Sequence, residues 1–316
     1  MSKIREYTLL TLKGIGVGAA NVIPGVSGGT IAFLTGIFER LINSLKSFNF
    51  RTTKLLFQGK FKQWAKETDI VFLLFIILGI AISAFSLAKL MLYLLHNHPV
   101  ATWGFFFGLV LVSCWYVIKD VKKWNIGTCF SLLLGIAIAV WVSLTSPSET
   151  PDTWWFILIA GAASICGMIL PGISGSFLLV LMVKYEDLMQ SISSLNIPRL
   201  ALYLIGAVAG LLAFSHFLAW LLKNWYNQTI ALLTGFMVGS LIKIWPWQQI
   251  LQGEGDKAIT HPILPAKYAA LNGCNPQIAT AIIMAILGIA IVVVLETWAN
   301  RSKASEEKKN QTPATK

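Results

Sequence analysis

Six long apolar runs constrain the fold of this chain more than any other feature. They cover residues 70–95, 100–118, 128–144, 200–222, 230–245 and 278–298. Each run approaches or reaches the roughly 20 residues that a helix needs to cross the hydrocarbon core of a bilayer. The runs lack the alternating pattern of a membrane barrel, so helices are the structure that satisfies their backbone in lipid. We therefore predict an all-α polytopic membrane protein.

The distribution of charge predicts the orientation of the chain. Only 12% of the 316 residues are charged, and the net charge is +11. Lys and Arg gather in the N-terminal stretch, in the loops 46–66 and 119–123 and after residue 300, whereas 96–99 and 146–153 contain none. This asymmetry is typical of cytoplasmic loops in membrane proteins rather than of a nucleic-acid-binding face. We expect both termini in the cytoplasm and no nucleic-acid partner.

A motif with Pro-Gly followed by small polar residues occurs twice. Asn21-Val-Ile-Pro-Gly-Val-Ser-Gly-Gly-Thr30 returns 147 residues later as Met168-Ile-Leu-Pro-Gly-Ile-Ser-Gly-Ser176. Pro-Gly breaks a helix, and each copy lies in the middle of an apolar segment. The first segment, 9–45, has basic residues on both sides and is slightly too short for two full crossings. We therefore predict a re-entrant helical hairpin with the motif at its tip.

Other blocks repeat in the same order, which indicates duplication. Phe38-Glu-Arg-Leu41 matches Tyr185-Glu-Asp-Leu188, and Leu134-Gly-Ile-Ala-Ile138 matches Leu287-Gly-Ile-Ala-Ile291. Three crossings after the first hairpin place 146–153 outside, so the second half starts on the opposite face. We predict two inverted-topology repeats and a polar cytoplasmic tail, 301–316. The first repeat, 1–150, has a hairpin at 9–45 and membrane helices at 70–95, 100–118 and 128–144. The second repeat, 151–300, has a hairpin at 154–195 and membrane helices at 200–222, 230–245 and 278–298.

The chemistry of the two motifs favours an anion. A helix that opens after Pro-Gly leaves backbone N–H groups unpaired at its positive end, where phosphate binds readily. The predicted substrate-binding residues are Asn21, Pro24, Gly25, Ser27, Gly28, Gly29 and Thr30 in the first motif, and Pro171, Gly172, Ser174, Gly175 and Ser176 in the second. The alternative is that these small residues only allow close helix packing.

Charged residues follow each motif. Glu39 and Glu186 occupy equivalent positions and could carry a proton, while Arg40 or Lys184 could pair with a phosphate. The alternative is that all four lie at solvated helix ends. The four cysteines form no close pair and the four histidines share no site by spacing, so we predict neither a metal nor a cofactor.

The two motifs, with Phe38-Glu39-Arg40 after the first, closely resemble domain-of-unknown-function family 368, which is associated with PopT-type undecaprenyl-phosphate translocases of bacteria. The resemblance spans about residues 10–300. It implies a multi-pass protein of the bacterial inner membrane that returns undecaprenyl phosphate to the inner leaflet by alternating access, with proton coupling open. The family usually has an aspartate where this chain has Asn21.

Two alternatives to a lipid translocase stay open. The first is a membrane enzyme similar to undecaprenyl-diphosphate phosphatases, whose motifs also read Pro-Gly-x-Ser. Such an enzyme needs an arginine beside the serine, and Gly28 occupies that place here. The second is a secondary transporter of a small soluble anion. We expect a transporter of undecaprenyl phosphate in contact with membrane lipids, and not an enzyme; the sequence does not set the oligomeric state.

Overall fold

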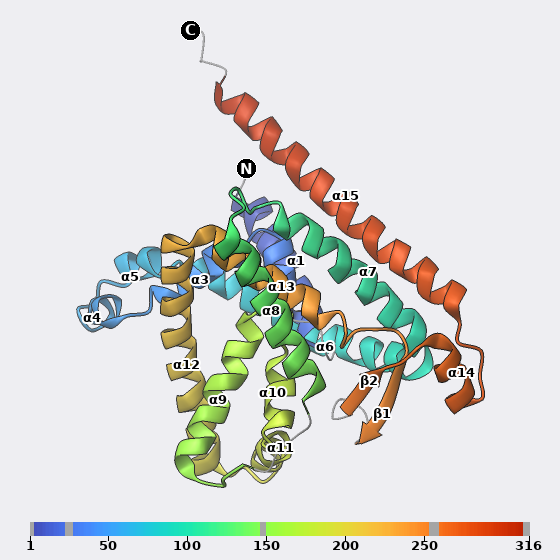
Figure 1. Cartoon of the computed structure of the whole chain (residues 1–316). Helices are drawn as coiled ribbons and strands as arrows, with labels where there is room; N and C mark the ends of the chain where they lie inside the picture. The colour runs from blue at the N-terminus through green and yellow to red at the C-terminus, as the bar shows by residue number, and fades with distance from the viewer. Residues whose placement is uncertain (1–2, 23–27, 146–149, 253–258, 312–316) are drawn as a thin grey trace.

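The computed structural model describes residues 3–22, 28–145, 150–252 and 259–311, and this part is almost entirely helical (Figure 1). Its helices are α1 (Lys3–Val22), α2 (Gly28–Leu34), α3 (Phe38–Lys46), α4 (Phe50–Phe57), α5 (Phe61–Glu67), α6 (Ile70–Asn97), α7 (Pro99–Ile118), α8 (Ile126–Leu144), α9 (Trp154–Ile169), α10 (Gly175–Leu181), α11 (Tyr185–Ser193), α12 (Ile197–Asn224), α13 (Tyr226–Ser240), α14 (Pro265–Asn272) and α15 (Ile278–Gln311). One antiparallel hairpin, β1 (Gln248–Gln252) and β2 (Ile259–Pro262), is an addition to the predicted all-helical fold.

Two three-helix segments contain the repeated motifs. α1, α2 and α3 have 20, 7 and 9 residues, and α9, α10 and α11 have 16, 7 and 9. Between the second and third helix of each segment the backbone is left-handed, at Gly36 (φ +68°) and at Val183 (φ +53°). These two residues are also 147 positions apart. A β-branched residue rarely adopts this conformation, so the geometry of the turn prevails over the local preference of valine.

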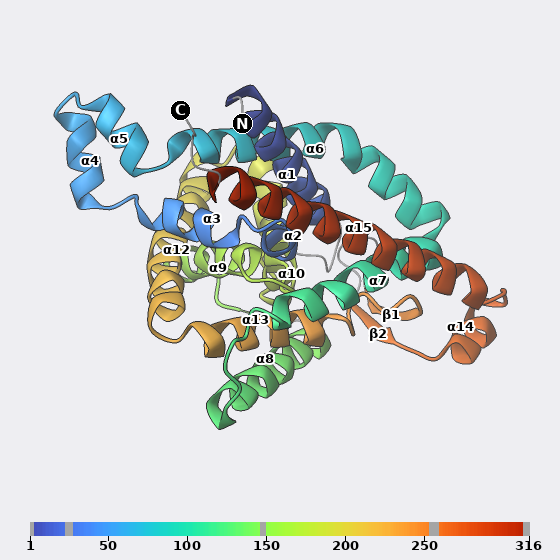
Figure 2. The ribbon, with the colours of Figure 1, turned by 90° about the horizontal axis from the view of Figure 1, so that it is seen from above.

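The most extensive helix contacts form two matched sets. α1 packs along α6 and α9 along α12, whereas α7 packs along α15 and α8 along α13. Figure 2 shows α15 beside α7 and α8 beside α13. The last two pairs each join one helix from the first half of the chain to one from the second. The two halves are therefore held together by long helix–helix interfaces.

Glycines allow the backbones in these four pairs to approach closely. A Cβ atom added at Gly79 would lie 2.2 Å from the carbonyl oxygen of Thr11, and one added at Gly108 would lie 2.0 Å from that of Ala285. The glycines at such contacts are Gly14, Gly18, Gly79, Gly104, Gly108, Gly135, Gly161, Gly206, Gly210, Gly235, Gly239 and Gly288. Close approach at small residues is the usual basis of helix association in membranes.

The exposed surface is apolar over long stretches. By length and composition, α7, α8 and α12 can each cross a bilayer, and shorter apolar helical stretches occur at Ile70–Ser83, Trp154–Ile169 and Ile278–Val294 among the described residues. On α8, Phe130, Leu133 and Trp141 are all more than 60% exposed. Water-soluble monomers rarely expose contiguous apolar surface of this kind, so lipid is the natural environment of this face.

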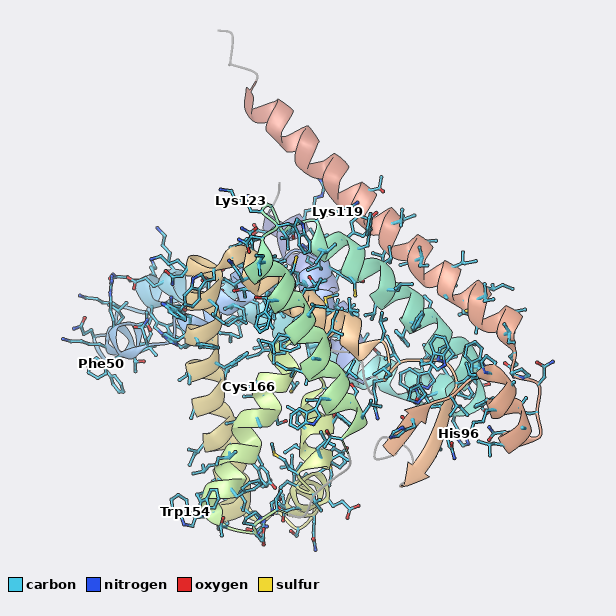
Figure 3. All side chains as sticks on the ribbon, viewed as in Figure 1. Phe50, His96, Lys119, Lys123, Trp154 and Cys166 are labelled. Carbon is cyan, nitrogen blue, oxygen red and sulfur yellow. The ribbon has the colours of Figure 1, made fainter. Side chains whose placement is uncertain are left out.

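The ends of the molecule differ in composition. Figure 3 shows Lys119 and Lys123 at one end and Trp154 at the opposite end. The C-terminal part of α15 extends past the end of α7, away from the other helices (Figure 1). α13 is shorter than its neighbours: it has 15 residues, most of them buried, and it ends at Ser240, whereas the apolar run predicted a membrane helix up to residue 245. The chain then turns before β1.

The interface between α7 and α15 provides a test of the packing. We expect Gly108→Ala to destabilise the protein by about 1–3 kcal/mol, because the methyl group must displace the backbone of α15. Thermal unfolding in detergent would show this as a lower Tm. Gly127→Ala is the control, since the added methyl group there meets only the side chain of Asn125, at 3.3 Å. Equal Tm values for the two variants would contradict the predicted role of Gly108.

Candidate functional site

The two interrupted segments lie in direct contact. The backbone N–H of Gly172 in the second motif donates a hydrogen bond to the hydroxyl oxygen of Thr30 in the first, over 3.2 Å. Thr30 is only 1% exposed. A Cβ atom added at Gly29 would lie 2.4 Å from the carbonyl oxygen of Ile169. Residues that are 142 positions apart in the sequence thus form one compact region.

The second motif has a backbone shape that requires glycine. Gly172 has φ +84°, and a Cβ atom there would also lie 2.5 Å from the carbonyl oxygen of Phe236 in α13. Pro171 before it is fully buried. Ser174 comes directly before α10, and its hydroxyl lies 2.9 Å from that of Ser176 instead of capping the helix. Gly175 is buried where α10 begins.

The helices that follow the two motifs are short. α2 and α10 have only seven residues each. The macrodipole of a helix is a sum over aligned peptide units and acts as a partial charge, and salt screens it. A full side-chain charge near the motifs would therefore contribute more to anion binding than either helix end.

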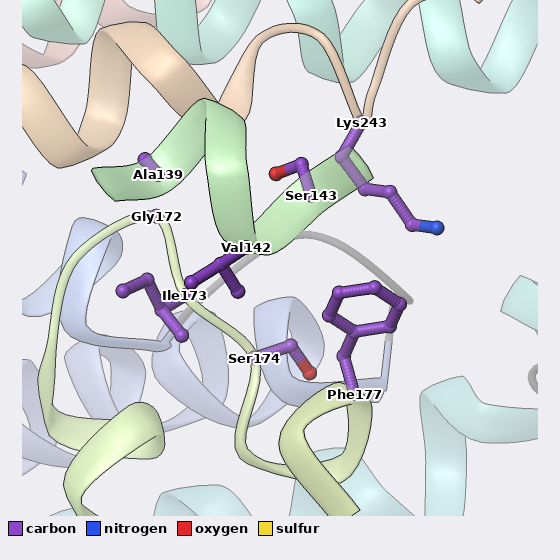
Figure 4. Close-up of a pocket in the computed structure, with 8 residues that line it drawn as sticks. All are labelled: Ala139, Val142, Ser143, Gly172, Ile173, Ser174, Phe177 and Lys243. Carbon is purple, nitrogen blue, oxygen red and sulfur yellow. The ribbon is translucent and has the colours of Figure 1, made fainter. Parts of the chain in front are cut away.

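Lys243 supplies such a charge. It lies in the turn after α13 and lines a narrow recess beside the second motif (Figure 4). The recess is lined by Ala139, Val142, Ser143, Gly172, Ile173, Ser174, Phe177 and Lys243. Its free space is about 10 Å³, room for about one water molecule. Lysine and serine side chains thus meet the backbone of the second motif at one place.

The surroundings of Lys243 are largely apolar. Its ammonium nitrogen lies 4.3 Å from the centre of the Phe177 ring and 3.4 Å from the hydroxyl oxygen of Thr260 in β2. Among the described residues, no carboxylate lies within ion-pair distance of this nitrogen. The sequence prediction missed Lys243 because it placed the residue near the end of a membrane helix. A lysine inside an apolar run was the available signal.

Arg40 is already paired. Its guanidinium makes two hydrogen bonds to the carboxylate of Asp69, over 2.6 and 3.0 Å, and lies 4.4 Å from the centre of the Phe72 ring. Glu6 of α1 is 3.9 Å away. Arg40 therefore connects α3 to the start of α6.

Lys184 belongs to a second charged network at the opposite hairpin. It is 5% exposed, and its ammonium donates to the carboxylate of Asp152 over 3.0 Å. Arg199 of α12 pairs with Asp152 and, over 2.7 Å, with Asp187 of α11. The hydrogen bonds from Arg199 and from Lys184 lower the pKa of Asp152 from its ordinary value. This network connects α11 to the start of α12.

The remaining predicted residues divide into two groups. Glu39 and Glu186 are both exposed on the surface of the protein. Glu39 lies beside the hydroxyl group of Tyr226 at the start of α13. Pro24, Gly25, Ser27 and the side chain of Asn21 lie outside the described residues. Gly28 is buried at the start of α2.

Comparison with known proteins identifies relatives over most of the chain. Residues 17–260 match the family described as VCA0040-like, undecaprenyl phosphate translocase-like. A polyprenyl-phosphate transporter of Vibrio cholerae is 36% identical over 305 residues, which cover 95% of this chain and 99% of the relative. A polyprenyl-phosphate transporter of Staphylococcus aureus is 34% identical over 256 residues, covering 74% of this chain and 85% of that protein. No solved structure matches the chain.

The hydrogen bond between the two motifs can be tested with similar side chains. Thr30→Val keeps the shape of the side chain but removes the acceptor for the Gly172 N–H. We expect it to destabilise the protein by about 1–2 kcal/mol, because a donor is left unpaired. Thr30→Ser retains the hydroxyl group and should lose less. Thermal unfolding would measure both, and a valine variant at least as stable as the serine variant would rule out this role for the hydroxyl.

Proposed function

The chain belongs to the undecaprenyl phosphate translocase-like family, and on this premise we propose that it moves undecaprenyl phosphate between the leaflets of the bacterial inner membrane. The observation that carries the proposal is the contact between the two motifs, in which Gly172 donates to Thr30 beside a recess with a lysine. A polar region of this kind, enclosed by apolar helices, suits a ligand with an anionic head and an apolar tail. The relatives from Vibrio cholerae and Staphylococcus aureus are both named polyprenyl-phosphate transporters.

We also propose that the two halves are inverted repeats around this region. The equal lengths of α2 and α10, of α3 and α11, and of α6 and α12 support it. So do the matched pairs of long contacts. Inverted repeats with broken helices near the midplane are typical of secondary transporters.

Transport by alternating access requires the recess to change size. The space beside Lys243 holds about one water molecule, so a phosphate group needs a wider state. For the lipid tail to remain in the bilayer, the wider state must also open beside α8, which lies between the recess and an exposed apolar face. The substrate-contacting residues of the proposal are Gly28, Gly29, Thr30, Pro171, Gly172, Ser174, Gly175 and Ser176, together with the first-motif residues outside the described part.

The charged residues of the hairpins have a different role in this proposal. Arg40 pairs with Asp69 at the start of α6. Lys184 pairs with Asp152, and Arg199 of α12 pairs with Asp152 and with Asp187 of α11, so each hairpin is held to the long helix that follows it. Glu39 and Glu186 are exposed, so proton coupling is not part of the mechanism that we propose.

Reconstitution in liposomes tests the function directly. We expect the purified protein to move labelled undecaprenyl phosphate between leaflets at least about tenfold faster than empty vesicles do, a factor equal to about 1.4 kcal/mol in the barrier. Undecaprenol, which has the same tail without the phosphate, should not be accelerated. Folded protein without transport activity would refute the proposal. Release of inorganic phosphate from undecaprenyl diphosphate would instead indicate an enzyme.

Two native cysteines test the proposed topology. Cys129 near the start of α8 and Cys274 before α15 are both exposed. With both termini in the cytoplasm, Cys274 faces outward and Cys129 inward. A membrane-impermeant maleimide should therefore label Cys274 in intact spheroplasts and Cys129 only after permeabilisation. Cys129→Ser and Cys274→Ser assign the signals, and labelling of Cys129 alone in intact spheroplasts would mean the opposite orientation.

A further inference from the structure

We propose that Lys243 binds the phosphate group of the transported lipid, an inference that rests on the proposed function and names a residue for it. Lys243 lines the recess beside the second motif, next to Ser143 and Ser174. Figure 4 shows the lysine extending over Phe177, with both serine hydroxyls at the same recess. A primary ammonium group and neighbouring hydroxyls match the acceptors and the negative charge of a phosphate monoester.

The charge balance of the recess favours an anion. None of the described residues that line the recess is acidic. An ammonium group in an apolar environment is costly without a counter-charge. The phenylalanine ring and the threonine hydroxyl compensate this cost only in part. A phosphate group would supply the missing negative charge.

The early end of α13 gives Lys243 its depth. The 15 residues of α13 extend about 22 Å at 1.5 Å per residue, which is less than the roughly 30 Å thickness of the hydrocarbon core of a bilayer. Because the chain turns at residues 241–244, Lys243 lies beside Gly172 and not beyond the end of a spanning helix. The side chain can therefore meet a phosphate that is crossing the membrane.

The first half has no equivalent charge. The blocks Gly104-Phe105 with Gly108 and Gly235-Phe236 with Gly239 place Val112 opposite Lys243 in the repeat. α7 continues as a regular helix through this position. In this proposal Lys243 therefore holds the phosphate at the second motif.

Substitution of Lys243 tests the inference in the liposome assay. We expect Lys243→Gln to slow the movement of undecaprenyl phosphate at least about tenfold, the effect of losing one hydrogen bond to a charged group, and Lys243→Arg to retain more activity than Lys243→Gln. Lys223→Gln, at the exposed end of α12, is the matched control and should transport normally. A folded Lys243→Gln variant with wild-type transport at all lipid concentrations would overturn the inference and leave the proposed function intact.

Chemical labelling of the wild-type protein gives a second test that does not depend on a variant. Succinimidyl acetate acylates accessible lysines, and mass spectrometry quantifies each site. Undecaprenyl phosphate should reduce the labelling of Lys243 at least about fivefold and leave Lys223 unchanged. If undecaprenol protects Lys243 from labelling equally well, or if undecaprenyl phosphate gives no protection, the inference is overturned. This result does not depend on whether the wild-type protein transports the lipid in liposomes.

The same experiment distinguishes the source of the phosphate. Protection by undecaprenyl phosphate but not by inorganic phosphate at the same concentration assigns the site to the lipid headgroup. Equal protection by inorganic phosphate would retain Lys243 as a phosphate-binding residue but would overturn its assignment to a lipid.

Discussion

The need to satisfy backbone polar groups away from water governs this structure. A helix that breaks inside an apolar segment releases N–H and C=O groups that lipid cannot satisfy. Here α2, the helix after the first break, lies against the second break, and the hydroxyl group of Thr30 accepts the hydrogen bond of one freed N–H, that of Gly172. Gly29 allows the backbones to come close enough for this contact. Two of the four long helix pairs, α7 with α15 and α8 with α13, join the halves that carry the two motifs.

The sequence predicted the local features of this arrangement well. The apolar helices and the helix break at Pro171-Gly172 follow from the conformational properties of single residues and from spacing along one helix. The partner of Arg40 lies on another helix, and the ion pair with Asp69 depends on how α3 and α6 meet. The sequence predicted Thr30 only as a substrate-binding residue. Its role as an acceptor for Gly172 arises from a contact across 142 positions, which no local pattern records.

The end of α13 is the other feature that the apolar pattern could not reveal. The run continues to Trp245, but the helix stops at Ser240 and the chain enters a hairpin of two strands. The indole N–H of Trp247 donates to the carbonyl oxygen of Pro276, which fixes this connection against the start of α15. Tertiary packing, and not hydrophobicity, decides where this segment leaves the helical conformation. The position of Lys243 depends on where α13 ends.

The ion pairs at the two hairpins have opposite polarity. In the first, an arginine on α3 meets an aspartate before α6; in the second, an aspartate on α11 meets an arginine on α12. Arg40 and Asp187 occupy matching positions, 147 residues apart. If α3 and α11 were exchanged, Arg40 would face Arg199 and Asp187 would face Asp69, so each junction would contain like charges. Each hairpin is thus compatible only with its own long helix, and the two halves are not interchangeable modules despite their shared architecture.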